Sequence, residues 1–378
     1  MAASRSDGPR HGVVRSAGAY RLIVRSIGTA DAAIVHSLRP LRVGSDAELA
    51  ALIYRAPSEL LADVDHDTGS KLVDVLRAAG LEVELVDADE AFEAGVGDLE
   101  VALAVQRFDN MLGIVEVVML VLGVDHAAAM KMVSASPAVL LGAVSQATAD
   151  ALARRFAPLG AEIDASRHAS AVFDLAAEAD DDTTTRVLAK LLPDANRSRF
   201  GADGGVFHAS GLDAAAAQSL WSELSRTAAK VRVINRDFQR FDVRLEAAPA
   251  TPATIGLLTA TTSMSEERAQ RALMRVPFVL AENVRGPRMV ELLEAVRTSG
   301  GRASASLLAL ASFGLALKPG GDRTAARPWV EAIAGTTAAS EFSVPDCHAL
   351  SGPLTKTQAR WLQHELRKHG IASHLVER

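Results

Sequence analysis

A repeat of about 70 residues governs how this chain of 378 residues can fold. Helical patterns that end at a small residue and continue into a short alternating strand recur along its length. These stops fall at Gly80, Gly160, Ala229, Gly301 and Gly370, so the successive intervals are 80, 69, 72 and 69 residues. Glycine readily adopts the left-handed conformation that ends a helix, so most of these positions mark helix C-termini. The spacing predicts five copies of one small unit.

The repeat also defines the segments that connect the units. Residues 1–19 carry arginines among small residues and are expected to form a flexible basic tail, with a transit peptide as the alternative. Residues 88–98 are acidic and contain glycine, so they are expected to form a linker and the main point of flexibility. The five expected modules span residues 20–87, 99–167, 170–237, 240–308 and 311–378.

Module 2, residues 99–167, shows the pattern most completely. It predicts an alternating strand, two apolar helices, a strand after Pro137, an amphipathic helix and a last strand. Modules 1 and 4 follow the same order. Modules 3 and 5 are degenerate: turn-forming residues 196–205 replace the second helix of module 3, and residues 336–350 form a degraded middle in module 5.

Charge, cysteine content and hydropathy exclude several classes of function. The formal net charge is −6 and no basic face is evident, which argues against a general nucleic-acid binder. Cys347 is the only cysteine, so an intrachain disulfide and a thiolate metal cluster are excluded, and a cytoplasmic setting is the simplest expectation. The apolar run at residues 117–124 is too short to span a membrane.

Motifs that suggest chemistry have simpler structural explanations. Residues 63–67 contain carboxylates and a histidine, but their place before a helix favours capping over metal binding. Cys347 and His348 are neighbours in sequence, and neighbours rarely face each other as nucleophile and base. The glycine-rich residues 201–211 lack the ending of a phosphate loop and are interpreted as a loop. The basic helix at residues 359–370 is interpreted as a solvated face, with an acidic partner as the alternative. We therefore expect no metal, no cofactor and no enzyme activity.

Apolar and turn positions of module 2 match a known small domain. The matching residues are Gly123, Val124, Ala129, Val133, Pro137, Val139, Gly142, Val144, Ser145, Ala149, Leu152, Leu159, Gly160, Ala161 and Ile163. Through them module 2 resembles the C-terminal domain of the bacterial ribosomal stalk protein L7/L12, whose general fold the adaptor ClpS shares. The resemblance implies an α+β chain of five tandem βααβαβ modules, each a three-stranded antiparallel sheet with helices on one face.

The resemblance also implies where partners bind. In the stalk family, basic side chains on the first two helices bind translation factors. Counted back from Pro137 without gaps, those positions hold Met111, Glu116, Met119, Ala127 and Met130. An apolar surface therefore replaces a basic one. The candidate partner-binding residues are Met111, Leu112, Val115, Glu116, Met119, Met130 and Lys131.

Two interpretations of this surface stay open. Methionine and valine at helical spacing are usually core residues. However, residues 111–122 are apolar around most of the helix, which is more than one small sheet covers and which favours docking. The first hypothesis is a non-catalytic scaffold that docks into a larger protein assembly. Contacts between its own modules or between copies of the chain are further possible uses of the apolar surface. The alternative is an adaptor that binds a translation factor or the ribosome, or delivers clients to a protease in the manner of ClpS.

Overall fold

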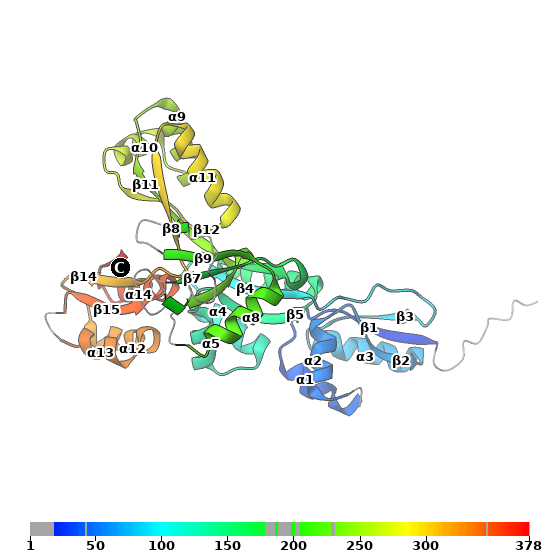
Figure 1. Cartoon of the computed structure of the whole chain (residues 1–378). Helices are drawn as coiled ribbons and strands as arrows, with labels where there is room; N and C mark the ends of the chain where they lie inside the picture. Colours follow the sequence, from blue (N-terminus) through cyan, green and yellow to red (C-terminus); the bar gives the residue numbers. More distant parts are fainter. Residues whose placement is uncertain are drawn as a thin grey trace, which may run out of the picture. The chain divides into compact units, whose positions relative to one another are not determined.

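The chain is an α+β protein, and its described residues form five small antiparallel sheets interleaved with helices (Figure 1). The computed structural model describes residues 19–41, 44–177, 186–187, 198–200, 205–227, 231–344 and 347–377. Within these residues four sheets have three strands and one has four, and the first strand of each module lies between two of its later strands. This shared strand order confirms the predicted α+β fold of tandem modules.

Contacts group the chain into two compact units. One comprises Met1–Gly97 with Ser145–Ala151, and the other comprises Asp98–Val144 with Leu152–Arg378. The first unit contains the sheet of module 1, and the second contains the other four sheets.

Module 1 has the complete order of elements. They are β1 (Tyr20–Ser26), α1 (Ala33–Leu38), α2 (Asp46–Tyr54), β2 (Ser58–Val64), α3 (His66–Ala78) and β3 (Glu82–Asp87). Asp65 begins α3 by accepting a hydrogen bond from the Thr68 N–H at 2.9 Å, so capping within residues 63–67 is confirmed. Residues of the acidic segment contact this module, because the Gly95 N–H donates to the Pro57 carbonyl oxygen at 2.7 Å.

Module 2 has a sheet that is covered on both faces. Its elements are β4 (Leu99–Val105), α4 (Met111–Leu122), α5 (His126–Val133), β5 (Ala138–Val144), α6 (Gln146–Phe156) and β6 (Ala161–Arg167). Residues 101–105 of β4 are all buried. Because successive side chains of a strand point to opposite faces of the sheet, both faces are buried at β4. The helices cover one face, so other parts of the second unit cover the opposite face.

Module 3 has an additional strand. Its described elements are β7 (Phe173–Ala177), β8 (Ser198–Phe200), β9 (Gly205–Leu212), α8 (Ala214–Leu224) and β10 (Val231–Asn235). β8 pairs with β9, so the prediction of a loop at residues 201–211 is wrong from Gly205 onward. Val206 and Phe207 favour a strand, and this preference outweighs the neighbouring glycines. The stop at Ala229 lies outside the described residues.

Module 4 has a sheet with one polar face. Its elements are β11 (Arg240–Ala247), α9 (Pro252–Thr262), α10 (Glu266–Leu273), β12 (Phe278–Arg285), α11 (Gly286–Thr298) and β13 (Arg302–Leu307). α11 packs on all three strands, above the buried Val243 and Leu245, whereas Arg244 between them is exposed. The left-handed stop after α11 is Gly300, with φ of 84°, and not Gly301 as the spacing predicted.

Module 5 is complete in structure. Its elements are β14 (Phe313–Leu317), α12 (Arg323–Ala334), α13 (Thr336–Phe342), β15 (Ala349–Leu354), α14 (Lys356–Lys368) and β16 (Ser373–Glu377). The expectation of a degraded middle at residues 336–350 is wrong for its first part, because α13 forms there and buries Ala338, Ala339 and Phe342. Its threonines, alanines and serine give only a weak hydrophobic pattern, which hides the helix in the sequence.

A shared backbone irregularity supports the repeat at the level of single residues. Asp63, Ala143 and Asn283 have φ of 51°, 56° and 55°, and each lies six residues after the proline that precedes its strand. At this point the pairing with the central strand shifts its register in all three modules. A residue with positive φ at such a bulge re-aims the strand end.

Candidate functional site

α4 and α5 carry the candidate residues of module 2. α4 ends at Gly123, whose φ of 65° is accessible to glycine at little cost. The Asp125 carboxylate then accepts a hydrogen bond from the Ala128 N–H at 2.8 Å and begins α5. The two helices pack against each other across a bend of 113°. Among the described residues, no single helix has both the length and the hydrophobicity of a membrane span.

Burial places part of the candidate set in the core. Met111, Val115 and Met130 are buried. Val118, one turn beyond Val115, is also fully buried, as is Ile114. For these positions the structure favours the core interpretation of the apolar pattern.

The outer side of α4 has a different character. Leu112, Glu116 and Leu120 follow one another at intervals of four residues and share one face of the helix. All three are exposed, Leu112 by 48% and Leu120 by 42%. Met119 beside them is half-buried, and Lys131 is exposed on α5. We name Leu112, Glu116 and Leu120 the outer strip; Leu120 was not among the sequence candidates, although its spacing from Leu112 could have identified it.

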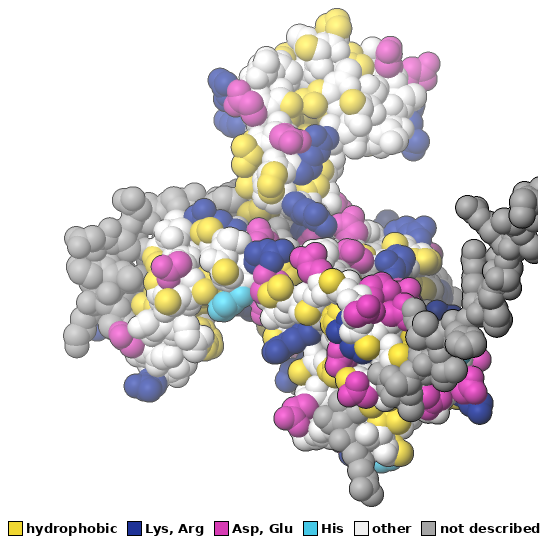
Figure 2. All heavy atoms as spheres, turned by 90° about the vertical axis from the view of Figure 1, so that its right-hand side faces the viewer, with side chains coloured by type: hydrophobic (Ala, Val, Ile, Leu, Met, Phe, Trp, Pro, Cys, Tyr) yellow, Lys and Arg dark blue, Asp and Glu magenta, His cyan; other side chains and the backbone are white. Residues whose placement is uncertain are grey.

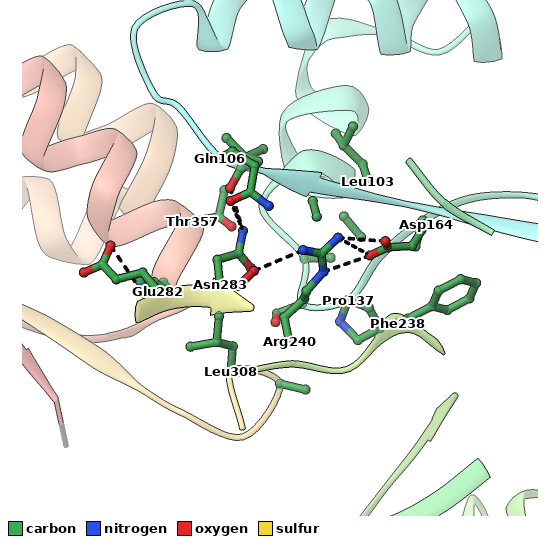
Figure 3. Close-up of a pocket in the computed structure, with 18 of the residues that line it drawn as sticks. Leu103, Gln106, Pro137, Asp164, Phe238, Arg240, Glu282, Asn283, Leu308 and Thr357 are labelled. Atoms are coloured by element: carbon green, nitrogen blue, oxygen red, sulfur yellow. Dashed lines mark hydrogen bonds and ion pairs between the residues drawn. The ribbon is translucent and has the colours of Figure 1, made fainter. Parts of the chain in front are cut away.

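A buried ion cluster joins modules 2 and 4. The Arg240 side chain, 9% exposed, donates from Nε and Nη2 to the Asp164 carboxylate, 4% exposed, at 2.9 and 2.7 Å (Figure 3). Its Nη1 donates to the Asn283 carbonyl oxygen at 3.0 Å. Arg285 lies 2.7 Å from Asp164, and Glu162 accepts a second bond from Arg240 at 3.0 Å. These residues come from β6, β11 and β12.

The cluster continues into module 5. Lys356, at the start of α14, forms an ion pair with Asp242 of β11 and lies 3.5 Å from Glu282 of β12. Arg360 also pairs with Glu282. Asp242 accepts a further hydrogen bond from the Asn283 N–H at 2.9 Å. The two parts together contain four cations and four carboxylates, so their formal charges cancel.

Asn283 connects the cluster to the end of β4. Its Nδ2 donates to the Val105 carbonyl oxygen at 2.8 Å and lies 3.3 Å from Oε1 of Gln106 (Figure 3). Asparagine tolerates the left-handed backbone that this bulge position requires. In addition, the Thr355 hydroxyl donates to the Ser134 carbonyl oxygen at 2.7 Å. Modules 2, 4 and 5 are therefore joined by directional bonds.

A cavity of about 150 Å³ lies beside this cluster. Its lining includes Leu103, Gln106, Pro137, Asp164, Phe238, Arg240, Glu282, Asn283, Leu308 and Thr357 (Figure 3). The cations and carboxylates that face it are bonded to one another. The cavity has room for a few water molecules, and its described lining offers no free acid and base pair for catalysis.

The remaining sequence motifs have structural partners. The Cys347 Sγ lies 3.2 Å from the Ala349 carbonyl oxygen. On α14, Lys368 forms an ion pair with Glu365 at 3.0 Å, and Arg360 pairs with Glu282. Two cations of the basic helix therefore have partners within the chain. Among the residues that the structure describes, no group of three or more histidine, cysteine, aspartate or glutamate side chains is arranged to hold a metal ion.

Hydrogen bonds at two helix N-termini lower the pKa values of carboxyl groups. The backbone N–H of Thr68 lowers the pKa of the Asp65 carboxyl. The backbone N–H of Ser45 lowers the pKa of Glu48, with the Ser45 hydroxyl adding to the effect. Hydrogen bonds stabilise the ionised form in both cases, so these shifts reflect capping.

The charge on the surface is mixed. The face drawn in Figure 2 carries lysine and arginine side chains interspersed with aspartate and glutamate. Comparison of the sequence with protein-family models finds no match, and neither does comparison with curated proteins. The architecture defines the class as a tandem-repeat α+β protein.

Proposed function

We propose that this protein is a non-catalytic scaffold of stalk-domain-like modules that docks into a larger protein assembly through the outer strip of α4. One observation carries the proposal: Leu112 and Leu120 are exposed on a helix whose other apolar side chains are largely buried. Exposed leucines aligned on one helix face are typical of helices that enter an apolar groove on a partner.

The outer strip suggests the shape of the partner surface. Leu112 and Leu120 are two turns apart, so they lie about 12 Å from each other along the helix. Glu116 lies between them and is exposed. A matching surface has two apolar pockets with a hydrogen-bond donor or cation between them.

The ion cluster supports a scaffold because it favours one arrangement of modules 2, 4 and 5. Removing one partner of a buried ion pair is strongly destabilising, whereas replacing both partners by apolar residues is often tolerated. Such pairs therefore contribute more to a defined geometry than to net stability. A defined geometry is what a scaffold needs in order to present α4 consistently.

The test is the size of the particle that contains the protein in extracts of its own cells. We expect the 39.8 kDa chain to migrate in a large particle that persists as salt rises, because apolar contacts are not screened. The L112E/L120E variant should leave that particle. The control V75E/V290E makes the same change at two other exposed residues and should remain.

Two results would contradict the proposal. One is a wild-type chain that migrates as a free monomer. The other is a particle that dissociates as salt rises, which would favour the charge-led adaptor instead.

A further inference from the structure

A second surface, on module 4, has a different chemistry. Arg268, Arg271 and Arg275 lie at intervals of three and four residues along α10 and just beyond its end, so they share one side. All three are exposed. None of them forms an ion pair with another described residue; Arg271 Nε only donates to the Glu267 carbonyl oxygen of its own helix, at 3.3 Å.

These arginines surround an apolar groove. The groove has a volume of about 400 Å³ and is lined, besides the arginines, by Met264, Ala272 and Phe278. Met274, which is 78% exposed, and Val279 add apolar surface on the same segments. In the lobe at the top of Figure 2, which holds α9–α11, apolar and charged side chains lie side by side. We name Arg268, Arg271, Arg275 and this apolar lining the arginine groove.

Helix electrostatics alone do not explain the three arginines. A helix dipole favours cations in the last turn, which accounts for Arg271 and Arg275. Arg268 is the third residue of α10, where the dipole disfavours a cation. The chain as a whole has a net charge of −6, so a generally basic surface does not explain the three arginines either.

The stalk resemblance does not explain them either. On the second helix of module 2, the basic positions of that family correspond to Ala127 and Met130, ten and seven residues before the module's proline. The same offsets in module 4 fall on Glu267 and Gln270. None of the three arginines therefore stands at a position of the family's basic surface.

We propose that the arginine groove binds an acidic segment of another protein, with carboxylates on the arginines and an apolar side chain in the groove. Guanidinium groups bind carboxylates through paired hydrogen bonds, and arginine clusters recur in recognition of acidic motifs. Arg268 and Arg275 are seven positions apart, which corresponds to about 10 Å along a helix. Two or three carboxylates on two turns of an acidic helix match that length.

The groove favours a peptide over a nucleic acid. Its apolar lining consists of Met264, Ala272 and Phe278, whose side chains offer apolar contact but no base-specific hydrogen bonds. Affinity for nucleic acid comes largely from many phosphate contacts and the release of their counterions. Three arginines on a chain with a net charge of −6 supply few such contacts.

The test is fluorescence anisotropy with the full chain and labelled twelve-residue probes. The main probe alternates glutamate with leucine. A second probe has lysine in place of glutamate, a third has glutamate and serine only, and a fourth is single-stranded DNA of the same length. We expect the glutamate–leucine peptide to bind most tightly and to weaken by about tenfold between low and high salt.

The decisive variant is R268E/R271E/R275E, which we expect to weaken binding of the glutamate–leucine peptide at least about tenfold. The control R288E/R297E/R302E makes the same charge change elsewhere on module 4 and should bind within about twofold of the wild type, although it also removes two surface ion pairs within α11. All six positions are exposed, so circular dichroism should show a retained fold.

Equal loss in both variants, preference for the DNA probe, or no binding to the main probe would overturn the proposal. The L112E/L120E variant should bind normally, so failure here is distinct from failure of the α4 proposal.

Discussion

Arg240 at the start of β11 bonds to both carboxylate oxygens of Asp164 on β6, although 76 positions separate the two residues in the sequence. Both side chains are almost completely buried. Asp164 also faces Arg285, so one carboxylate holds two cations of module 4 against module 2. The contact of Asp164 with Arg240 and Arg285 holds module 4 against the second face of the module 2 sheet, so that face is covered.

Removing the Arg240 charge should loosen the junction. R240M leaves the Asp164 carboxylate without its main partner and should cost about 3–5 kcal/mol. Hydrogen exchange of the amides in β6 and β11 measures this loss locally. The control R244M, at an exposed position of the same strand, should change exchange by less than about 0.5 kcal/mol. Similar exchange in the two variants would show that Arg240 does not join the modules.

The two sides of α4 should respond differently to the same substitution. V118E places a carboxylate in the core and should unfold module 2, because an unpaired buried charge costs several kcal/mol. L120E is on the exposed side and should leave the fold intact. Limited proteolysis and circular dichroism distinguish the two, and a folded V118E protein would refute the assignment of the inner face.

Acid should weaken the start of α3 through Asp65. Hydrogen bonds from Thr68 lower the pKa of Asp65 in the folded state below its ordinary value of 3.8. The stabilisation is therefore complete above that value and is lost as the pH falls through the lower, folded pKa. An NMR titration should report a depressed pKa for this carboxyl. D65N keeps the cap but cannot titrate, so it should remove this part of the acid sensitivity; an unshifted pKa would contradict the capping geometry.

Two glycines of module 4 should respond with opposite signs to alanine. G300A places a side chain at φ of 84° and should cost about 1–2 kcal/mol. Gly256 lies on an exposed side of α9 with open space around it, so G256A should stabilise by about 0.5–1 kcal/mol. Thermal unfolding of the full chain measures both, and a neutral G300A would indicate that the helix does not end there.

Local patterns in the sequence predicted most of the elements because their causes are local. The strand alternation of β11 and the stop at Gly160 depend on neighbouring residues only. The spacing predicted the helix stop at Gly301 and not at Gly300, because a repeat interval does not distinguish adjacent glycines. α13 was missed because small residues such as Ala338 bury little area each.

The contacts between modules were beyond the sequence pattern because they join distant positions. The Arg240–Asp164 pair is an example, since neither residue has a local signal. One signal was available in β4: its outward positions are Ala102 and Ala104, where β11 has Arg244 and Glu246. Small apolar residues on the open face of a strand indicate that another element covers it.

Site-specific photo-crosslinking in the native cells tests whether the outer strip of α4 is a docking surface. A photoreactive residue replaces Leu120, and for comparison Val75, which is also exposed. We expect position 120 to form a covalent adduct with one defined protein, whereas position 75 should form none. No adduct at position 120, or the same adducts from both positions, would contradict that docking role.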